Sequence, residues 1–154
     1  MEDARQYCTF YVAGHYFGVD VLRVQEVIRY QEMTRVPLAP PVVRGLINLR
    51  GQIVTAIDLR RRLELHDRPE DQLPVNVVVH TDDGAISLLV DEIGDVLEVL
   101  EKAFERPPET LQGPARELIR GAYKLEDRLL LILEIEQTVN LTATASERGI
   151  ERPE

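Results

Sequence analysis

The sequence predicts a mainly β protein in which two similar small units pack together. Short apolar runs are separated by tight-turn signals, namely Ala13-Gly14, Arg50-Gly51 and Asp82-Asp83-Gly84. Helical periodicity is sparse, and the same strand-turn-strand pattern occurs in both halves of the chain. Chains with many short strands close into sandwiches or small barrels because closure hides the strand edges.

Four predicted hairpins account for most of the strands. They cover residues 7–12 with 15–19, 45–49 with 52–57, 75–79 with 85–90, and 119–125 with 129–133. The run 129–133 is continuously apolar, which indicates a strand buried on both faces. Gly51 in the second hairpin is free to adopt a positive φ, and Arg50 is displayed at the tip of that hairpin.

Short helices are expected at three places. Asp20 is a plausible N-cap for a first helix, in which Val21, Val24, Val27 and Ile28 follow helical spacing. Asp58 is a second plausible N-cap, and residues 136–141 form a third helical pattern. The basic run Arg60-Arg61-Arg62 is expected to be a solvated face.

A self-comparison of the sequence supports two related units. Arg44-Gly45-Leu46 aligns with Arg120-Gly121-Ala122, and without a gap Asp58 then falls on Glu134. At a slightly different offset, Glu26-Val27 aligns with Glu98-Val99. We interpret this as a repeated β unit.

Composition and charge exclude several classes of protein. The 154-residue chain has a net charge of -9, and no basic stripe with interleaved aromatic residues is present, so nucleic-acid binding is not expected. No apolar run approaches the ~20 residues that span a bilayer, and the charged N-terminus does not resemble a secretory signal. With Cys8 as the single cysteine, no internal disulfide can form, and we expect a cytoplasmic protein without direct membrane insertion.

The sequence offers no set of residues suited to catalysis, a metal site or a cofactor. His15, His66 and His80 fall in a turn, a loop and a strand end, without the spacing of metal ligands. Cys8 lies in a predicted strand, where a buried inert thiol is expected. No glycine-rich phosphate-binding loop carries a lysine. We therefore expect a protein that is not an enzyme.

An ordered set of motifs resembles the CheW family of chemotaxis coupling proteins. It begins with Phe10-Tyr11-Val12 and continues through Val36-Pro37, Arg44-Gly45 and Asn48-Leu49-Arg50-Gly51. The later segments 89–97 and 127–133 resemble the family's second half. The resemblance implies a CheW-like fold: two small five-stranded SH3-like β-barrel subdomains packed together, with a hydrophobic layer between them and a few short helices.

The expected domain is a single CheW-like domain over residues 7–141. Its two pseudo-repeated subdomains are predicted at roughly 7–65 and 75–141, joined by a polar, proline-containing loop. The residues 142–154 are small, polar and charged, and are predicted to be a disordered tail.

The resemblance implies a non-enzymatic chemotaxis adaptor that couples membrane chemoreceptors to the histidine kinase CheA in signalling arrays. The expected partners are the regulatory domain of a CheA-type kinase and the cytoplasmic tip of methyl-accepting chemoreceptors. The protein would then be cytoplasmic and associated with membrane-bound receptor arrays. No cofactor is implied.

Two candidate surfaces follow from this resemblance. One is an apolar groove for the receptor tip, with Glu26 as the expected ion partner of Arg50; it comprises Val24, Glu26, Val27, Arg50, Ile93, Val96 and Leu97. The other is a kinase-binding surface on the second hairpin, comprising Gly45, Asn48 and Gly51.

Three alternatives remain open at the level of sequence. The chain could be a regulatory-domain fragment of a CheA-type kinase, although it contains no phosphotransfer or ATP-binding segment. A CheV-like protein would require a receiver domain after the CheW-like domain. A β-barrel protein-binding module outside chemotaxis is the third alternative.

Overall fold

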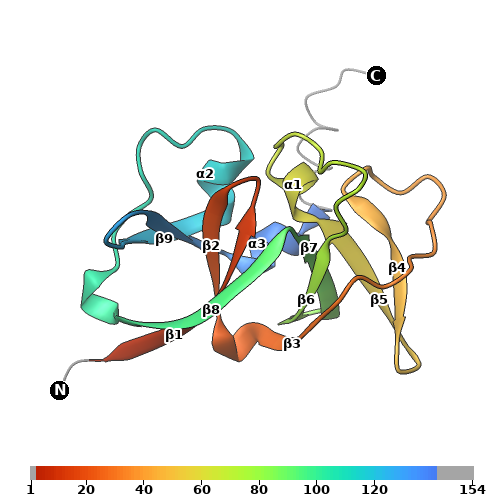
Figure 1. Ribbon diagram of the computed structural model, residues 1–154, viewed down its shortest axis with the longest axis horizontal. Coiled ribbons are helices and arrows are strands. Elements are labelled where there is room, and N and C mark those ends of the chain that lie inside the picture. Colours follow the sequence, from red (N-terminus) through yellow and green to blue (C-terminus); the bar gives the residue numbers. More distant parts are fainter. Residues whose placement is uncertain (1–2, 142–154) are drawn as a thin grey trace.

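The computed structural model describes residues 3–141, and most of this part of the chain is β-structure (Figure 1). The strands are β1 (Ala4–Val12), β2 (His15–Asp20), β3 (Val24–Ile28), β4 (Val43–Leu49), β5 (Gln52–Asp58), β6 (Val75–Thr81), β7 (Gly84–Val90), β8 (Glu92–Leu100), β9 (Ile119–Lys124) and β10 (Leu129–Leu133). The helical elements are all short: η1 (Val21–Arg23), α1 (Leu59–Arg62), η2 (Glu101–Ala103), α2 (Pro114–Leu118) and α3 (Ile135–Val139). No helix within residues 3–141 is long and apolar enough to cross a membrane.

The strands form two five-stranded sheets. The first has the order β8-β1-β2-β10-β9 and the second has the order β3-β6-β7-β5-β4. In each sheet the two hairpins meet through one parallel pair, β2 with β10 and β5 with β7. The remaining strand pairs are antiparallel.

A single bridge joins the two edges of each sheet. Thr34, beyond β3, exchanges two backbone hydrogen bonds of 2.8 Å with Leu46 of β4. Glu105, beyond β8, exchanges bonds of 2.8 and 2.9 Å with Ala122 of β9. Each sheet therefore curls into a small SH3-like barrel. The regular strand pairs leave this barrel open, and one isolated bridge joins its two edges.

The two sheets have equivalent strand orders, and each combines strands from both halves of the chain. The aligned segments around Arg44-Gly45 and Arg120-Gly121 lie on β4 and β9, which occupy equivalent edges of the two sheets. The first sheet, however, combines β1 and β2 with β8, β9 and β10, whereas the second contains β3 to β7. The predicted division into 7–65 and 75–141 therefore does not coincide with the two sheets.

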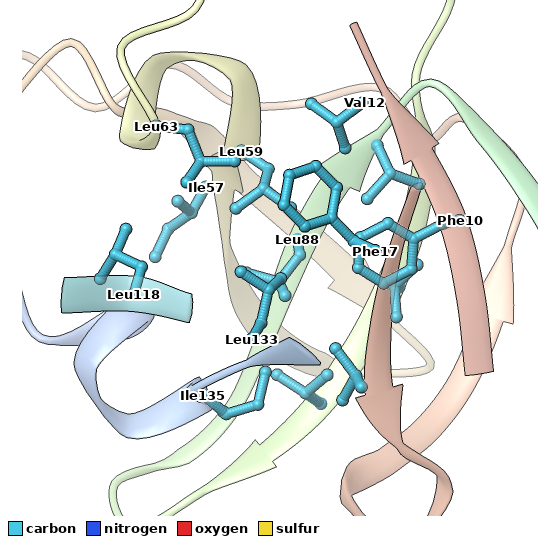
Figure 2. Packing of buried hydrophobic residues seen from close by; sticks show 14 of the residues in the cluster. Phe10, Val12, Phe17, Ile57, Leu59, Leu63, Leu88, Leu118, Leu133 and Ile135 are labelled. Carbon is cyan, nitrogen blue, oxygen red and sulfur yellow. The ribbon is translucent and has the colours of Figure 1, made fainter. Parts of the chain in front are cut away.

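The largest hydrophobic cluster lies between the sheets. Phe10, Phe17 and Leu133 from the first sheet pack in one cluster with Ile57 and Leu88 from the second (Figure 2). Each sheet also encloses a smaller cluster: Tyr7, Tyr16, Tyr123, Leu130 and Ile132 in the first, and Ile47, Leu49, Val54 and Val78 in the second. This arrangement confirms the hydrophobic layer that the CheW resemblance implied.

The predicted hairpin turns are confirmed in detail. Ala13 and Gly14 have φ values of 51° and 83°, and Arg50 and Gly51 have 53° and 89°. Because both central residues of each two-residue loop have a positive φ, the loops have the pattern of type I′ turns, which match the twist of antiparallel strands. Arg50 adopts this backbone conformation despite its side chain.

The predicted first helix is wrong beyond its first turn. Asp20 does cap a helical turn, since its Oδ1 accepts from Leu22 N at 2.9 Å, but η1 ends at Arg23. Residues Val24–Ile28 then form β3, which pairs with β6. The run is rich in β-branched residues, whose stiff side chains fit a strand better than a helix. Asp58 caps α1 as predicted, and the third helix begins at Ile135.

One strand was not predicted from the sequence, and one further expectation is corrected. Residues 92–100 form β8, a nine-residue strand on the edge of the first sheet that the acidic composition of this segment concealed. Arg60 and Arg62 are not on a solvated face: only 5% and 8% of their surfaces are exposed. The predicted tail, residues 142–154, lies outside the described residues.

Candidate protein-binding surface

The tip of the β4–β5 hairpin presents an arginine held by the neighbouring edge strand. Arg50 donates from both terminal nitrogens to the carboxylate of Glu26, with Nη1 at 3.2 Å from Oε1 and Nη2 bonded to Oε2. The side chain of Arg50 is 69% exposed and that of Glu26 is 21% exposed. The hydrogen bonds from Arg50 hold the pKa of Glu26 below its usual value. The predicted pairing is confirmed, although Glu26 lies on a strand and not on a helix.

Asn48 fixes the shape of the same turn. Its Oδ1 accepts a hydrogen bond of 2.8 Å from the backbone N–H of Gly51. Asn48, Arg50 and Gly51 are all exposed, so this end of the hairpin is accessible to a partner. Local bonds from asparagine to the backbone are a common way to stabilise a turn.

Gly45 has a structural position and does not reach the surface. It is buried in β4, where an added Cβ would lie 2.7 Å from the backbone oxygen of Thr34 and 2.9 Å from Cβ of Met33. This close approach is what permits the bridge between Thr34 and Leu46. Of the three residues predicted for kinase binding, Asn48 and Gly51 are therefore presented to solvent, while Gly45 supports the hairpin from beneath.

The apolar residues predicted for the receptor groove lie on the edge strands of both sheets. Val27 on β3 is 40% exposed, and Ile93 and Val96 on β8 are 41% and 55% exposed. Val24 is only partly buried and packs against the cluster between the sheets, whereas Leu97 packs against the cluster inside the first sheet. Val24 and Leu97 thus anchor β3 and β8 to the core. Val27, Ile93 and Val96 present apolar surface to solvent.

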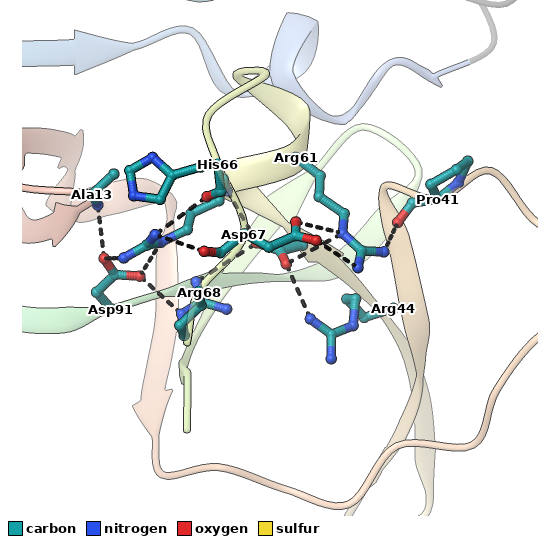
Figure 3. Close-up of polar contacts among 10 residues, drawn as sticks. Ala13, Pro41, Arg44, Arg61, His66, Asp67, Arg68 and Asp91 are labelled. Carbon is teal, nitrogen blue, oxygen red and sulfur yellow. Dashed lines mark hydrogen bonds and ion pairs between the residues drawn. The ribbon is translucent and has the colours of Figure 1, made fainter. Parts of the chain in front are cut away.

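A buried ion-pair network, which the sequence did not indicate, joins the two sheets (Figure 3). Asp91, at the end of β7, accepts from Arg60 Nε at 3.0 Å and Nη2 at 2.6 Å, and from Arg68 Nε at 2.9 Å. Its Oδ2 also accepts from the backbone N–H of Ala13 at 2.7 Å, in the β1–β2 turn of the other sheet. A carboxylate with this many donors fixes how the two sheets meet.

The charge state of Asp91 follows from these contacts. Burial alone would raise its pKa, but the hydrogen bonds from Arg60, the Ala13 N–H and Arg68 outweigh burial and lower the pKa below its usual value. The same contacts with Asp91 raise the pKa of Arg60. Asp91 and Arg60 are therefore both charged at neutral pH.

A second buried carboxylate, Asp58, continues the network toward the surface. It accepts from the backbone N–H of Arg60 at 3.0 Å and from Arg44 Nη1 at 3.1 Å. Arg61 binds Asp67 at 3.1 Å and the carbonyl oxygen of Pro41 at 2.9 Å. The short α1 helix thus ties β5 to the surrounding loops through its arginines.

The described residues do not assemble a site for metal chemistry. Across residues 3–141, no group of three or more His, Cys, Asp or Glu side chains could hold a metal ion. The contacts of Asp58 and Asp91 are with arginines and backbone N–H groups, as in a structural network.

This chain is similar to known proteins over most of its length. A family model for the CheW-like domain matches residues 6–143, nearly the whole chain. The chain belongs to the CheW family. Among curated relatives, the chemotaxis protein CheW of Bacillus subtilis is 32% identical over 137 residues, which cover 89% of this chain and 88% of that protein.

Other CheW proteins agree with this assignment. The chemotaxis protein CheW of Treponema pallidum is 28% identical over 134 residues, which cover 84% of this chain and 79% of that protein. The crystal structure of the scaffolding protein TtCheW from Thermoanaerobacter tengcongensis superposes with a TM-score of 0.79 at 27% identity. The superposition covers 90% of this chain and 92% of TtCheW. The predicted CheW-like fold is therefore confirmed.

Proposed function

We propose that this CheW-family chain is a non-enzymatic chemotaxis adaptor that couples membrane chemoreceptors to the histidine kinase CheA in signalling arrays. The observation that carries the proposal is the CheW-like domain over residues 6–143. Similarity to several chemotaxis CheW proteins over most of their length favours this function over a kinase fragment, a CheV-like protein or an unrelated module. The place of action is then the cytoplasmic side of a receptor array.

The receptor-binding surface is proposed to combine Arg50 and Glu26 with the apolar residues of β3 and β8. An amphipathic helical hairpin such as a receptor tip would bury Val27, Ile93 and Val96, which are substantially exposed in the free protein. Apolar burial contributes ~25 cal/mol per Å², and much of it offsets the entropy of association. We expect a modest affinity, which repetition of sites in an array would increase.

Arg50 is proposed to determine the orientation of the receptor and not its affinity alone. The planar guanidinium binds Glu26 with two nitrogens, and most of its surface still faces solvent. An arginine in this geometry can keep its carboxylate partner and meet a further acceptor on a receptor. Lysine, which carries one ammonium group, cannot reproduce the two-nitrogen contact.

The kinase-binding surface is proposed to lie on the β4–β5 hairpin, with Asn48 and Gly51 at the contact and Gly45 as its support. The partner would be the regulatory domain of CheA. The type I′ turn at Arg50-Gly51 makes the backbone of this hairpin a defined shape that a partner can recognise.

The proposal is tested by titrating the full chain with the isolated CheA regulatory domain. Gly51→Val and Gly14→Val form a matched pair, since both glycines have a positive φ in a two-residue turn and neither has an atom within 4 Å of an added Cβ. Each substitution should cost about 1–3 kcal/mol of backbone strain. Only Gly51→Val should also weaken kinase binding.

Two results would contradict this part of the proposal. Absence of binding by the wild-type chain would remove the adaptor function. Equal weakening by Gly14→Val and Gly51→Val would show that the kinase does not contact the β4–β5 hairpin.

A further inference from the structure

A hollow of about 500 Å³ opens beside the buried ion-pair network. Its wall includes three arginines, Arg44, Arg61 and Arg68, together with Asp67 and Glu70. Arg44 and Arg61 also line a neighbouring hollow of about 810 Å³ beneath the proline-rich segment 35–41.

Arg68 carries donors that are buried without acceptors. Its side chain is only 3% exposed, and Nε is used by Asp91 at 2.9 Å. Nη1 and Nη2 are both buried and have no hydrogen-bond partner within the described part of the chain. Nη2 lies 3.6 Å from Oδ1 of Asp58, which is too far for a hydrogen bond. Buried donors of a charged group are costly unless an acceptor meets them.

The nearby carboxylates are already engaged. Asp58 accepts from Arg44 and from the backbone of Arg60, and Asp67 binds Arg61. Arg44 and Arg68 reach opposite oxygens of the same Asp58 carboxylate, at 3.1 and 3.6 Å, so their guanidinium groups converge beside the hollow. Glu70 is exposed, and its charge opposes an anion at this place.

We infer that this hollow is a binding site for a small oxyanion of the size of inorganic phosphate. Arg44 would donate to the oxyanion from the partly exposed side, and a small movement of loop 66–74 would bring the buried Nη groups of Arg68 to it. Guanidinium groups suit oxyanions because their N–H donors lie in one plane at the spacing of paired oxygens. Bound there, the anion would join segment 29–44 to loop 66–74.

Titration with inorganic phosphate, followed through the arginine Nε–Hε signals in NMR spectra of the full chain, tests this site. Potassium chloride at matched ionic strength controls for screening. We expect saturable shifts in the wild type, and about tenfold weaker binding in Arg44→Gln and Arg68→Gln from the loss of charge-assisted hydrogen bonds. Glu70→Gln should bind more tightly, because a repelling carboxylate is removed.

Arg116→Gln is the matched control, since Arg116 is an exposed arginine on α2 that does not line the hollow. It should titrate as the wild type does. If Arg68→Gln does not fold, Arg44→Gln still decides, because Arg44 is 36% exposed. Absence of saturable shifts in the wild type, or wild-type affinity in Arg44→Gln, would overturn the inference.

Discussion

Arg50 combines a positive φ of 53° with an exposed side chain and a two-nitrogen contact to Glu26. A residue other than glycine in this backbone region usually has a local reason to be there. The partner here is on the edge strand of the same sheet, so the turn positions the guanidinium at a strand edge. The pairing therefore holds the side chain of Arg50 in position for a partner. It adds little to the stability of the fold, as is usual for exposed ion pairs.

Replacing Arg50 by alanine should separate binding from folding. The backbone strain at φ 53° is the same for both residues, and no core volume is lost, so Tm should stay within about 2 °C of the wild type. Binding to a receptor fragment should fall, and Arg50→Lys should restore it poorly. Calorimetric titration against the receptor fragment and the CheA regulatory domain checks this; equal loss toward both would mean that Arg50 supports the fold.

Unlike Arg50→Ala, Asp91→Asn should strongly lower the stability of the fold. The side chains of Asp91 and Arg60 are 7% and 6% exposed, and the amide would leave Arg60 and Arg68 without their anion. Breaking such a buried pair costs about 3–5 kcal/mol. Chemical denaturation at neutral pH measures the loss.

The pH dependence of stability gives a second test of Asp91. A carboxyl whose pKa is lowered by folding stabilises the protein above its unfolded pKa, and this contribution is lost as the pH falls through the folded pKa. The usual value for aspartate is 3.8, so the wild type should lose stability below about pH 4. Asp91→Asn should show a shallower loss over that range, and a slope equal to that of the wild type would contradict the assignment.

At the scale of elements, the hairpins were predictable, whereas the edge strands β3 and β8 were not. Turn residues act locally, so Ala13-Gly14 and Arg50-Gly51 could be placed from the sequence. The spacing of Val21, Val24 and Val27 fits a helix as well as a strand, and only pairing with β6 decides between them. The strand β8 carries Glu92, Asp95 and Glu98 on an exposed edge, which masked its pattern.

The two closing bridges should differ in their tolerance of substitution. Gly45 and Gly121 lie at equivalent places, but an added Cβ at Gly45 meets the backbone of Thr34 at 2.7 Å, whereas at Gly121 it meets the ring of Phe104 at 1.9 Å. Phe104 is 36% exposed, so its ring can rotate away, while the backbone of Thr34 must move and break the bridge. Gly45→Ala should therefore lower the free energy of unfolding by about 1–3 kcal/mol, and more than Gly121→Ala.

Parallel thermal or denaturant unfolding of Gly45→Ala and Gly121→Ala checks this ranking. A larger loss of stability for Gly121→Ala would contradict this ranking, because it would show that the ring of Phe104 cannot rotate away.

At the scale of the whole molecule, the fold joins its two halves by exchange of strands. The parallel pairs β2–β10 and β5–β7 connect segments far apart in sequence, which hairpin signals cannot reveal. The resemblance to CheW supplied the fold class, and the Glu26–Arg50 pair was also foreseen. The pairs formed by Asp91 with Arg60 and Arg68 were not, because distant charges in a sequence do not show which of them meet.

The shared core has a consequence for the adaptor function. The apolar cluster between the sheets and the Asp91 network hold the two sheets together, and β3 and β8 are edge strands of these two sheets. A ligand that contacts both edge strands would then meet a preformed surface. Preformed surfaces lose less entropy on binding. We therefore expect the receptor tip to bind without a rearrangement of the two sheets.

Co-sedimentation of three components tests the adaptor function most directly: the full chain, the CheA regulatory domain and a receptor cytoplasmic hairpin. We expect the receptor fragment to sediment with the CheA domain when the chain is present. We expect Arg50→Ala to remove the receptor fragment while the chain stays with the CheA domain. Mutual exclusion of the two partners, or sedimentation of the chain with neither of them, would contradict the adaptor function.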